Sequence, residues 1–339
     1  MLGRGAKRSS RRSAAHRRRG PERAHPLVRL ARRARRRLIA KRRRSMTPAQ
    51  WVVLAAGVPA IGVVLARRRL RVPPAVTLVL VTAAPLAVSA ATPRRRWRYA
   101  VVGAAYMWSF EVTWELPYEN PKLRERLRVA YPVRIDSVIG LGVPPGQRLQ
   151  QALRDPARVT TLDKVVTVIY ASWFTPHMLL AWLLVRHPEY VPRAAGRLAA
   201  AYHLTTPFYY LVPTPPPWWA SENAGLMDGQ VQRVRRKVVD SLFHKPRKTD
   251  VGNPWASMPS DHIASAAITA MGLAELGAVP GALGWTYVAL ASFAVVYLGE
   301  HYVIDVLVGL AIAAAIQRGE ASVTPLVHRI VVALERVGS

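Results

Sequence analysis

Apolar segments recur along this chain, each close to the roughly 20 helical residues that cross the hydrocarbon core of a membrane. Arg clusters, Pro, or Trp and Tyr bound them, as is typical of the ends of membrane spans. We expect eight spans, at residues 49–66, 74–92, 99–116, 162–185, 194–212, 260–278, 281–298 and 302–316. The sequence therefore predicts an all-α fold, a polytopic transmembrane helical bundle.

The third segment is the least apolar of these. It contains Glu111 and Glu115 one helical turn apart, and carboxylates that face lipid are costly. We therefore expect both side chains to face the bundle or water, or the segment not to span fully. The connection after it, residues 118–161, mixes charges with Leu, Val and Ile, which favours helices lying in the membrane interface.

Residues 1–46 are rich in Arg and contain few acidic or large apolar residues. Such a segment cannot bury enough apolar surface to offset the entropy of ordering it, so we expect a disordered, basic cytoplasmic tail. The chain has a formal net charge of +30, and we expect the tail to contact anionic lipid headgroups rather than a specific nucleic acid. The absence of Cys excludes disulfides.

Two histidines stand where apolar helices are expected to begin: His262 in "MPSDHIASAAI" and His301 in "LGEHYVIDVLVGL". One span separates these helices, so both begin on the same side of the membrane and the imidazoles lie at the same depth. Asp305 follows His301 by one helical turn, where its carboxylate can accept Nδ1–H and leave Nε2 as a nucleophile. Ser260 is well placed as the N-cap of the first helix, whose free N–H groups would attract a phosphate.

These residues carry a resemblance to a known family. "MPSDH" and "GEHYVID" resemble the second and third signature blocks of the type 2 phosphatidic acid phosphatase (PAP2) superfamily. "PTPPPWW", residues 213–219, is similar to the proline-tryptophan block of its inositol-phosphorylceramide synthase (Aur1-like) branch, as are the shorter stretches "RLQ" and "LDKVVTVIY". The likeness covers residues 99–316.

The resemblance implies a PAP2-like core of about six helices, with extra spans before it. It also implies an enzyme that acts on a membrane lipid phosphate through a phosphohistidine intermediate, with no metal and no other cofactor. Carried over by position, His301 would be the nucleophile, Asp305 its orienting partner, and His262 the general acid that protonates the leaving oxygen. The Aur1-like branch implies transfer of a phospho-headgroup, there phosphoinositol, to a lipid alcohol; hydrolysis of phosphatidic acid or a polyprenyl phosphate is the alternative.

Two parts of the superfamily pattern are missing. No Arg-Pro pair occurs in the chain, and Val295 stands where the third block usually carries an Arg, so the phosphate clamp must come from elsewhere. The basic run "QRVRRKVVDSLFHKPRKTD", which includes Arg235, supplies candidates. The expected substrate- and phosphate-binding residues are Ser260, Arg233, Arg236, Lys245, Arg247, Lys248 and Trp218. Asp261 and Glu300, beside the two histidines, are expected to face solvent.

Two other interpretations stay open. The two histidines and their acidic neighbours offer enough nitrogen and oxygen ligands for a divalent metal ion. A membrane transporter would instead use Glu111, Glu115 and Asp163 as pathway residues.

The expected organisation has four parts: a tail at 1–46, a transmembrane hairpin at 47–98, a PAP2/Aur1-like catalytic membrane domain at 99–316, and a C-terminal tail at 317–339. Three spans and then two more separate the basic tail from His262. An odd number of crossings places the site on the extracytoplasmic side of what we expect to be a bacterial plasma membrane. The sequence carries no signal of oligomeric state.

Overall fold

The computed structural model describes residues 47–337, apart from 94, 96 and 244–252. The expected tail at 1–46 lies outside the described residues. Within them the chain is helical, and the β pairing is limited to a single bridge between Thr214 and Ala256. The all-α prediction is confirmed.

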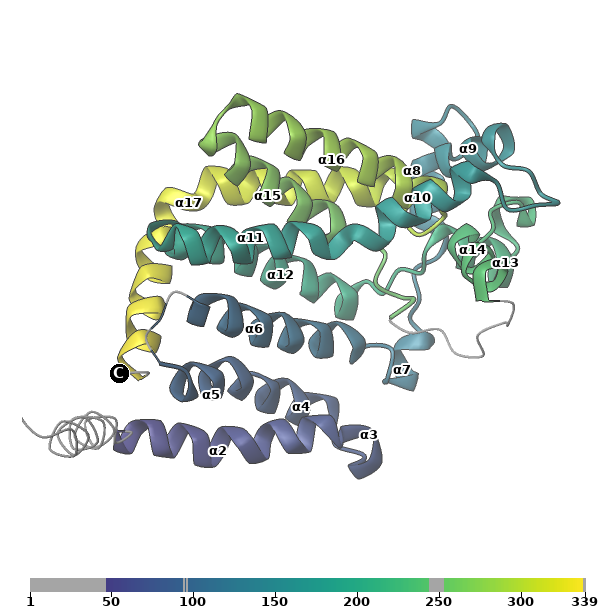
Figure 1. Cartoon of the computed structure of the whole chain (residues 1–339). Coiled ribbons are helices and arrows are strands. Elements are labelled where there is room, and N and C mark those ends of the chain that lie inside the picture. Colours follow the sequence, from purple (N-terminus) through teal and green to yellow (C-terminus); the bar gives the residue numbers. More distant parts are fainter. Residues whose placement is uncertain (1–46, 94, 96, 244–252, 338–339) are drawn as a thin grey trace, which may run out of the picture. The chain divides into compact units, whose positions relative to one another are not determined.

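Helices occupy all the expected spans (Figure 1). In chain order they are α2 (Pro48–Leu65), α4 (Pro74–Val81) with α5 (Ala83–Ala91), α6 (Trp97–Glu115), α10 (Thr161–Ala171) with α11 (Thr175–Arg186), α12 (Val191–Leu211), α15 (Asp261–Leu276), α16 (Ala278–Tyr297) and α17 (Val303–Val337). Three segments within the described residues are long and apolar enough to cross a membrane by length and composition alone: Pro48–Leu65, Pro74–Ala91 and Ala278–Tyr297. These features fit a multi-pass membrane protein.

Short helices lie between the longer ones. Those before α12 are α3 (Arg67–Leu70), α7 (Pro121–Arg124), α8 (Ala130–Ile139), α9 (Pro145–Leu153), η1 (Ser172–Phe174) and η2 (Pro188–Tyr190). Those after it are α13 (Pro217–Ala224), η3 (Leu226–Gly229) and α14 (Val234–Phe243). In Figure 1, α8, α9, α13 and α14 gather at the end of the bundle where α15 and α17 begin.

The acidic third segment forms the continuous helix α6, and its last carboxylate is neutralised. Oε2 of Glu115 lies 2.6 Å from Nη2 of Arg67 and 3.3 Å from Nη2 of Arg68. Both arginines also pair with Glu119, just beyond the helix. Glu115 therefore sits at the end of a span with a cationic partner, which removes the cost of exposing it to lipid.

Small residues hold α15 and α16 closely together. A Cβ atom on Gly284 would lie 2.8 Å from Cα of Ala270, and one on Gly281 would lie 2.9 Å from Cα of Ala274. Such close approach is how membrane helices gain packing energy where lipid supplies no hydrophobic drive. The contact fixes the end of α15 against the start of α16, at the end of the two helices away from His262 and His301.

Helix α17 continues to Val337, well past residue 316 where its apolar segment was expected to end. Beyond its apolar segment, the polar continuation of α17 is stabilised by ion pairs with neighbouring helices. Nη2 of the buried Arg197 on α12 lies 2.6 Å from Glu320 on α17 and 2.7 Å from Glu275 on α15. This ion cluster joins three helices at the end of α15 away from His262.

Candidate active site

The structure brings the two histidines together as the topology predicts. His262 lies in the first turn of α15, and His301 immediately precedes α17. Their rings meet edge to face, with centroids 5.5 Å apart and an interplanar angle of 68°. His301 is 4% exposed, whereas His262 is half-buried. The more enclosed imidazole is thus the one that has an acid one turn away.

Asp305 faces His301 with one carboxylate oxygen. Its Oδ2 lies 3.3 Å from Nδ1 of His301 and accepts hydrogen bonds from the Tyr302 N–H at 2.9 Å and the Ser257 hydroxyl at 2.5 Å. Its Oδ1 is buried and has no hydrogen-bond partner among the described residues. Donors therefore converge on a single oxygen, which orients the carboxylate and the ring together.

The first turn of α17 is capped from a distance by Asp136 on α8. Its carboxylate accepts hydrogen bonds from the N–H groups of Val303 at 2.9 Å and Ile304 at 3.0 Å. Burial raises the pKa of Asp136 to about 6, although these two N–H groups act in the opposite direction. Sequence reasoning missed Asp136, because a cap supplied from 167 residues away leaves no local pattern.

Ser260 occupies the N-cap position of α15, as expected, but its hydroxyl makes no capping hydrogen bond. The hydroxyl is fully buried and has no partner among the described residues. The backbone N–H of Ser260 instead donates to the carbonyl of Asp305 at 3.0 Å. Gly309 permits this approach of α17, since a Cβ there would lie 2.5 Å from the Ser260 carbonyl oxygen.

Glu300 does not face solvent, and the expectation that it would is wrong. It is 8% exposed, and its Oε1 lies 2.9 Å from Nε of Arg235 and 3.4 Å from Nε of Arg233. Burial alone would raise the pKa of Glu300, but the two guanidinium groups outweigh it and hold the pKa below its ordinary value. The two guanidinium groups together carry one positive charge more than Glu300 neutralises.

Asp261 also departs from the expectation of solvent exposure. It is half-buried at the start of α15 and accepts a hydrogen bond from the hydroxyl of Thr205 on α12 at 3.2 Å. Helix α15 is therefore joined to α12 at its first residue.

The Pro-rich block around Trp218 forms the frame of the site. Thr214 receives the Ser257 N–H at 2.9 Å and donates its own N–H to the carbonyl of Trp255 at 2.9 Å. Trp218 donates its backbone N–H to the carbonyl of Gly299 at 3.1 Å, and its ring is covered by the guanidinium of Arg233 at 4.2 Å. One block thus holds both the loop before His262 and the turn before His301.

Two aromatic residues, Tyr170 at the end of α10 and Trp173 in η1, flank His262, and sequence reasoning did not single them out. The ring centroid of Tyr170 lies 5.3 Å from that of His262, and Trp173 lies 5.9 Å away, edge on. The guanidinium of Arg235 lies 5.3 Å above the Tyr170 ring. Arg235 therefore connects Glu300, beside His301, to the aromatic wall beside His262.

Gln150, in the "RLQ" stretch, fastens the basic run to the rest of the site. Its amide donates to the carbonyls of Tyr297 at 2.8 Å and Gln232 at 3.0 Å, and its oxygen accepts the Gln232 N–H at 2.9 Å. Gly299 passes beside it with a φ of +74°, a conformation that favours glycine.

Other expected residues lie elsewhere. Arg236 forms an ion pair of 3.8 Å with Asp240 on its own helix and is 48% exposed. Lys245, Arg247 and Lys248 lie outside the described residues. Asp163, a candidate pathway residue, is buried and accepts from the Thr160 N–H and the Tyr297 hydroxyl, at 2.8 and 2.6 Å.

This end of the bundle holds an imidazole oriented by a buried carboxylate, a second imidazole facing it, and two arginines that pair with one acid. A nucleophile opposite a proton donor suits in-line displacement at phosphorus, and guanidinium groups suit the charge of a phosphate. Among the described residues, no group of three or more His, Asp or Glu side chains is arranged to hold a metal ion.

Comparison with known proteins agrees with this geometry. No curated protein and no solved structure matches the chain. Residues 133–318, more than half of the chain, match the PAP2 superfamily, and both histidines, Asp305, Glu300 and the two arginines fall inside the match. The chain therefore belongs to the PAP2 superfamily.

Proposed function

We propose that this protein is a metal-independent membrane lipid phosphotransferase of the Aur1-like type. It would move a phosphoryl group or phospho-headgroup from a lipid donor to a lipid alcohol. Membership of the PAP2 superfamily already indicates phosphatase or phosphotransferase activity on lipids. The observation that carries the proposal is the histidine pair, with ring centroids 5.5 Å apart and Asp305 oriented toward only one of them.

In the first step, the Nε2 lone pair of His301 attacks phosphorus while the bond from phosphorus to the leaving oxygen breaks. His262 donates a proton to that oxygen, so the donor's alcohol portion leaves neutral. In the second step, the acceptor's hydroxyl oxygen attacks phosphorus, its proton passes to His262, and the bond from phosphorus to nitrogen breaks. Asp305 stabilises the cationic ring of the intermediate.

The phosphate's charge needs cationic partners, and Arg233 and Arg235 are the best placed of the candidates. Both are held by Glu300, which directly precedes the nucleophile. Ser260 adds a buried hydroxyl beside His262, and Trp218 presents an indole N–H without a partner among the described residues. Arg236, Lys245, Arg247 and Lys248 remain predictions as phosphate contacts.

Transfer is preferred to hydrolysis because of "PTPPPWW". The structure gives this block a place in the site, where Thr214 and Trp218 support both histidine-bearing segments. This supports the Aur1-like branch, in which a lipid alcohol is the acceptor. Hydrolysis of a lipid phosphate by water is the second candidate.

Product analysis tests the proposal. The full-length protein in mixed micelles is given phosphatidylinositol or phosphatidic acid, each with and without ceramide or diacylglycerol. We expect a new phospholipid that forms only when the alcohol is present, persists in EDTA and disappears with vanadate. Release of a free phosphate or headgroup at the same rate whatever the alcohol would favour the phosphatase. Loss of turnover in EDTA with recovery on adding zinc or magnesium would favour a metal enzyme, and solute flux in vesicles without turnover would favour a transporter.

The remaining expectations belong to this proposal. The site would lie on the extracytoplasmic side of a bacterial plasma membrane, and residues 1–46 would contact anionic lipid on the other side. The hairpin at 47–98 would precede a catalytic domain that begins near residue 99.

A further inference from the structure

Ser257 has a place in the site that no sequence pattern assigned to it. It lies in "NPWASMPSDH", three residues before Ser260, and is 3% exposed. Its backbone N–H donates to the carbonyl of Thr214 at 2.9 Å, so the Pro-rich block fixes the position of its main chain. The side chain is therefore presented to its neighbours from a rigid loop rather than from α15 or α17.

The hydroxyl of Ser257 lies between the nucleophile and its acid. Its Oγ is 2.5 Å from Oδ2 of Asp305, 3.4 Å from Nδ1 of His301 and 3.4 Å from the Glu300 carbonyl oxygen. The bond to Asp305 is the shortest of the contacts that Oδ2 receives. A hydrogen bond from a hydroxyl to an ionised carboxylate is about twice as strong as one between neutral groups.

We propose that Ser257 is a positioning residue for the phosphotransfer, which orients Asp305 and the Nδ1–H of His301 together; this inference rests on the proposed function of His301. Its hydrogen atom points to Asp305, which leaves an oxygen lone pair to accept the Nδ1–H of His301. Serine and carboxylate then hold the same tautomer, with the proton on Nδ1 and the lone pair on Nε2. The loop before His262 thereby orients the nucleophile that precedes α17.

The test is Ser257→Ala in the full-length protein, measured with the donor and acceptor that the product analysis identifies. Because Ser257 acts through Asp305 and not on the lipid, we expect kcat to fall about 10- to 100-fold, as for the loss of one hydrogen bond to a charged group, with KM nearly unchanged. Ser257→Thr keeps the hydroxyl and should recover most of kcat. Ser109→Ala is the matched control, since Ser109 is also buried but bonds the backbone carbonyls of Val81 and Ala105.

A double-mutant cycle with Asp305→Asn locates the effect. If Ser257 works through Asp305, adding Ser257→Ala to Asp305→Asn should lower kcat by much less than tenfold. Full additivity, an unchanged kcat in Ser257→Ala, or a rise in KM alone would overturn the inference. If the alanine variant does not fold, the threonine variant decides: wild-type kcat supports the role, and a loss as large as that of Asp305→Asn contradicts it. Failure of the proposed function is seen separately, as a phosphorylated intermediate that survives in His301→Ala.

Discussion

His301 and His262 have different neighbours, and this difference assigns their roles. His301 is enclosed and has Asp305 and Ser257 at its Nδ1. His262 is half-buried and flanked by Tyr170 and Trp173, and its ring meets that of His301 in an edge-to-face arrangement. An imidazole held by an acid is suited to carry a covalent phosphoryl group, whereas the more open one is suited to exchange protons with substrates.

His301→Ala should therefore abolish both turnover and the phosphorylated intermediate. His262→Ala should slow donor cleavage by about 10²–10⁴-fold, and least for a p-nitrophenyl ester, whose leaving group needs no proton. Asp305→Asn should fold but lose much of the rate, because an amide can hold the wrong tautomer and cannot stabilise a cationic ring. Labelled enzyme is trapped in alkaline detergent and its peptides are mapped, with the exposed His187→Ala as control. Label on the His262 peptide would reverse the assignment.

Glu300 offers a prediction about stability and pH. Glu300→Gln removes a buried carboxylate that pairs with Arg233 and Arg235, and breaking a buried ion pair should lower the unfolding free energy at pH 7 by up to about 3–5 kcal/mol. The folded pKa of Glu300 is lowered, so its contribution is present above the ordinary value of 4.5 and is lost as pH falls through the folded pKa. The difference between wild type and variant in thermal unfolding should thus be full at pH 7 and narrow below pH 4.5. Glu125→Gln, at the exposed residue that caps the C-terminus of α7, is the control, and a pH-independent difference would contradict the argument.

Sequence reasoning could find His262, His301 and Asp305, because their pattern is local: a helix start, and an acid at i+4. It could not find Asp136 or Ser257, whose partners lie 167 and 48 residues away. It placed Glu300 in solvent because burying a carboxylate is costly by itself. The cost is offset only when another element brings cations such as Arg233 and Arg235 to it. The basic run alone does not say which of its arginines turns inward.

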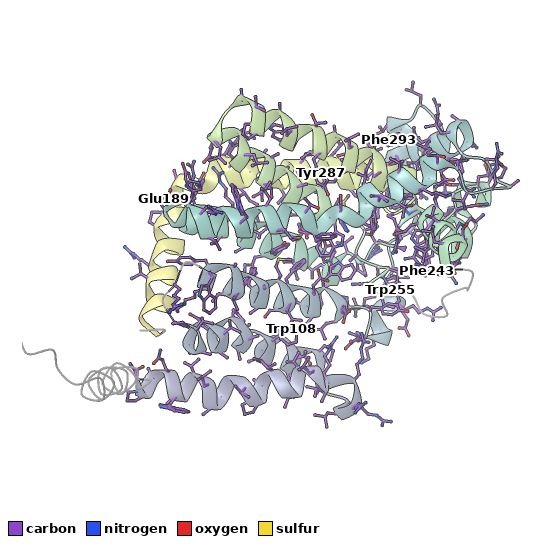
Figure 2. All side chains as sticks on the ribbon, in the orientation of Figure 1. Trp108, Glu189, Phe243, Trp255, Tyr287 and Phe293 are labelled. Carbon is purple, nitrogen blue, oxygen red and sulfur yellow. The ribbon has the colours of Figure 1, made fainter. Side chains whose placement is uncertain are left out.

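At the scale of elements, the site depends on how closely α17 approaches the start of α15. Gly309 lies against the Ser260 carbonyl, and the Ser260 N–H bonds the carbonyl of Asp305. Helix positions were predictable from apolar length and Arg or Pro boundaries, but this contact was not, since it depends on one backbone approaching another. The break at η1 was likewise unexpected; there the hydroxyl of Tyr287, labelled in Figure 2, bonds the Ser172 carbonyl at 3.0 Å.

Gly309→Ala tests this helix contact. The added Cβ would lie 2.5 Å from a backbone oxygen, so α17 must shift away from α15, at a cost of about 1–3 kcal/mol and with loss of turnover as the two imidazoles separate. Gly319→Ala, on the same helix with nothing within 4 Å of the new atom, should be neutral or slightly stabilising. Thermal unfolding and turnover are measured for both variants in the same detergent. Equal behaviour of the two would show that the close approach does not matter.

At the scale of the described bundle, the charge of the two ends does not say which end faces the cytoplasm. The connections at the end with the histidines, residues 118–161 and 218–258, are rich in Arg, and so is the sequence of residues 1–46, which the expected topology assigns to the opposite side. The positive-inside rule therefore does not orient the bundle by itself. The number of crossings orients the bundle only if α6 spans the membrane. The ion pair between Glu115 and Arg67 at the end of α6 supports a spanning α6.

Cysteine labelling can decide which end faces outward, because the chain has no Cys of its own. Ala224→Cys lies at the exposed end of α13, on the side of the histidines, and Glu189→Cys lies in the exposed turn between α11 and α12. The 21 residues of α12 separate these two sides by about 31 Å, and Figure 2 labels Glu189 far from Trp255 of the site loop. With an extracytoplasmic site, an impermeant maleimide should label Ala224→Cys in intact cells and Glu189→Cys only after the membrane is opened. The opposite pattern would place the site in the cytoplasm, and labelling of both in intact cells would mean that α12 does not cross the membrane.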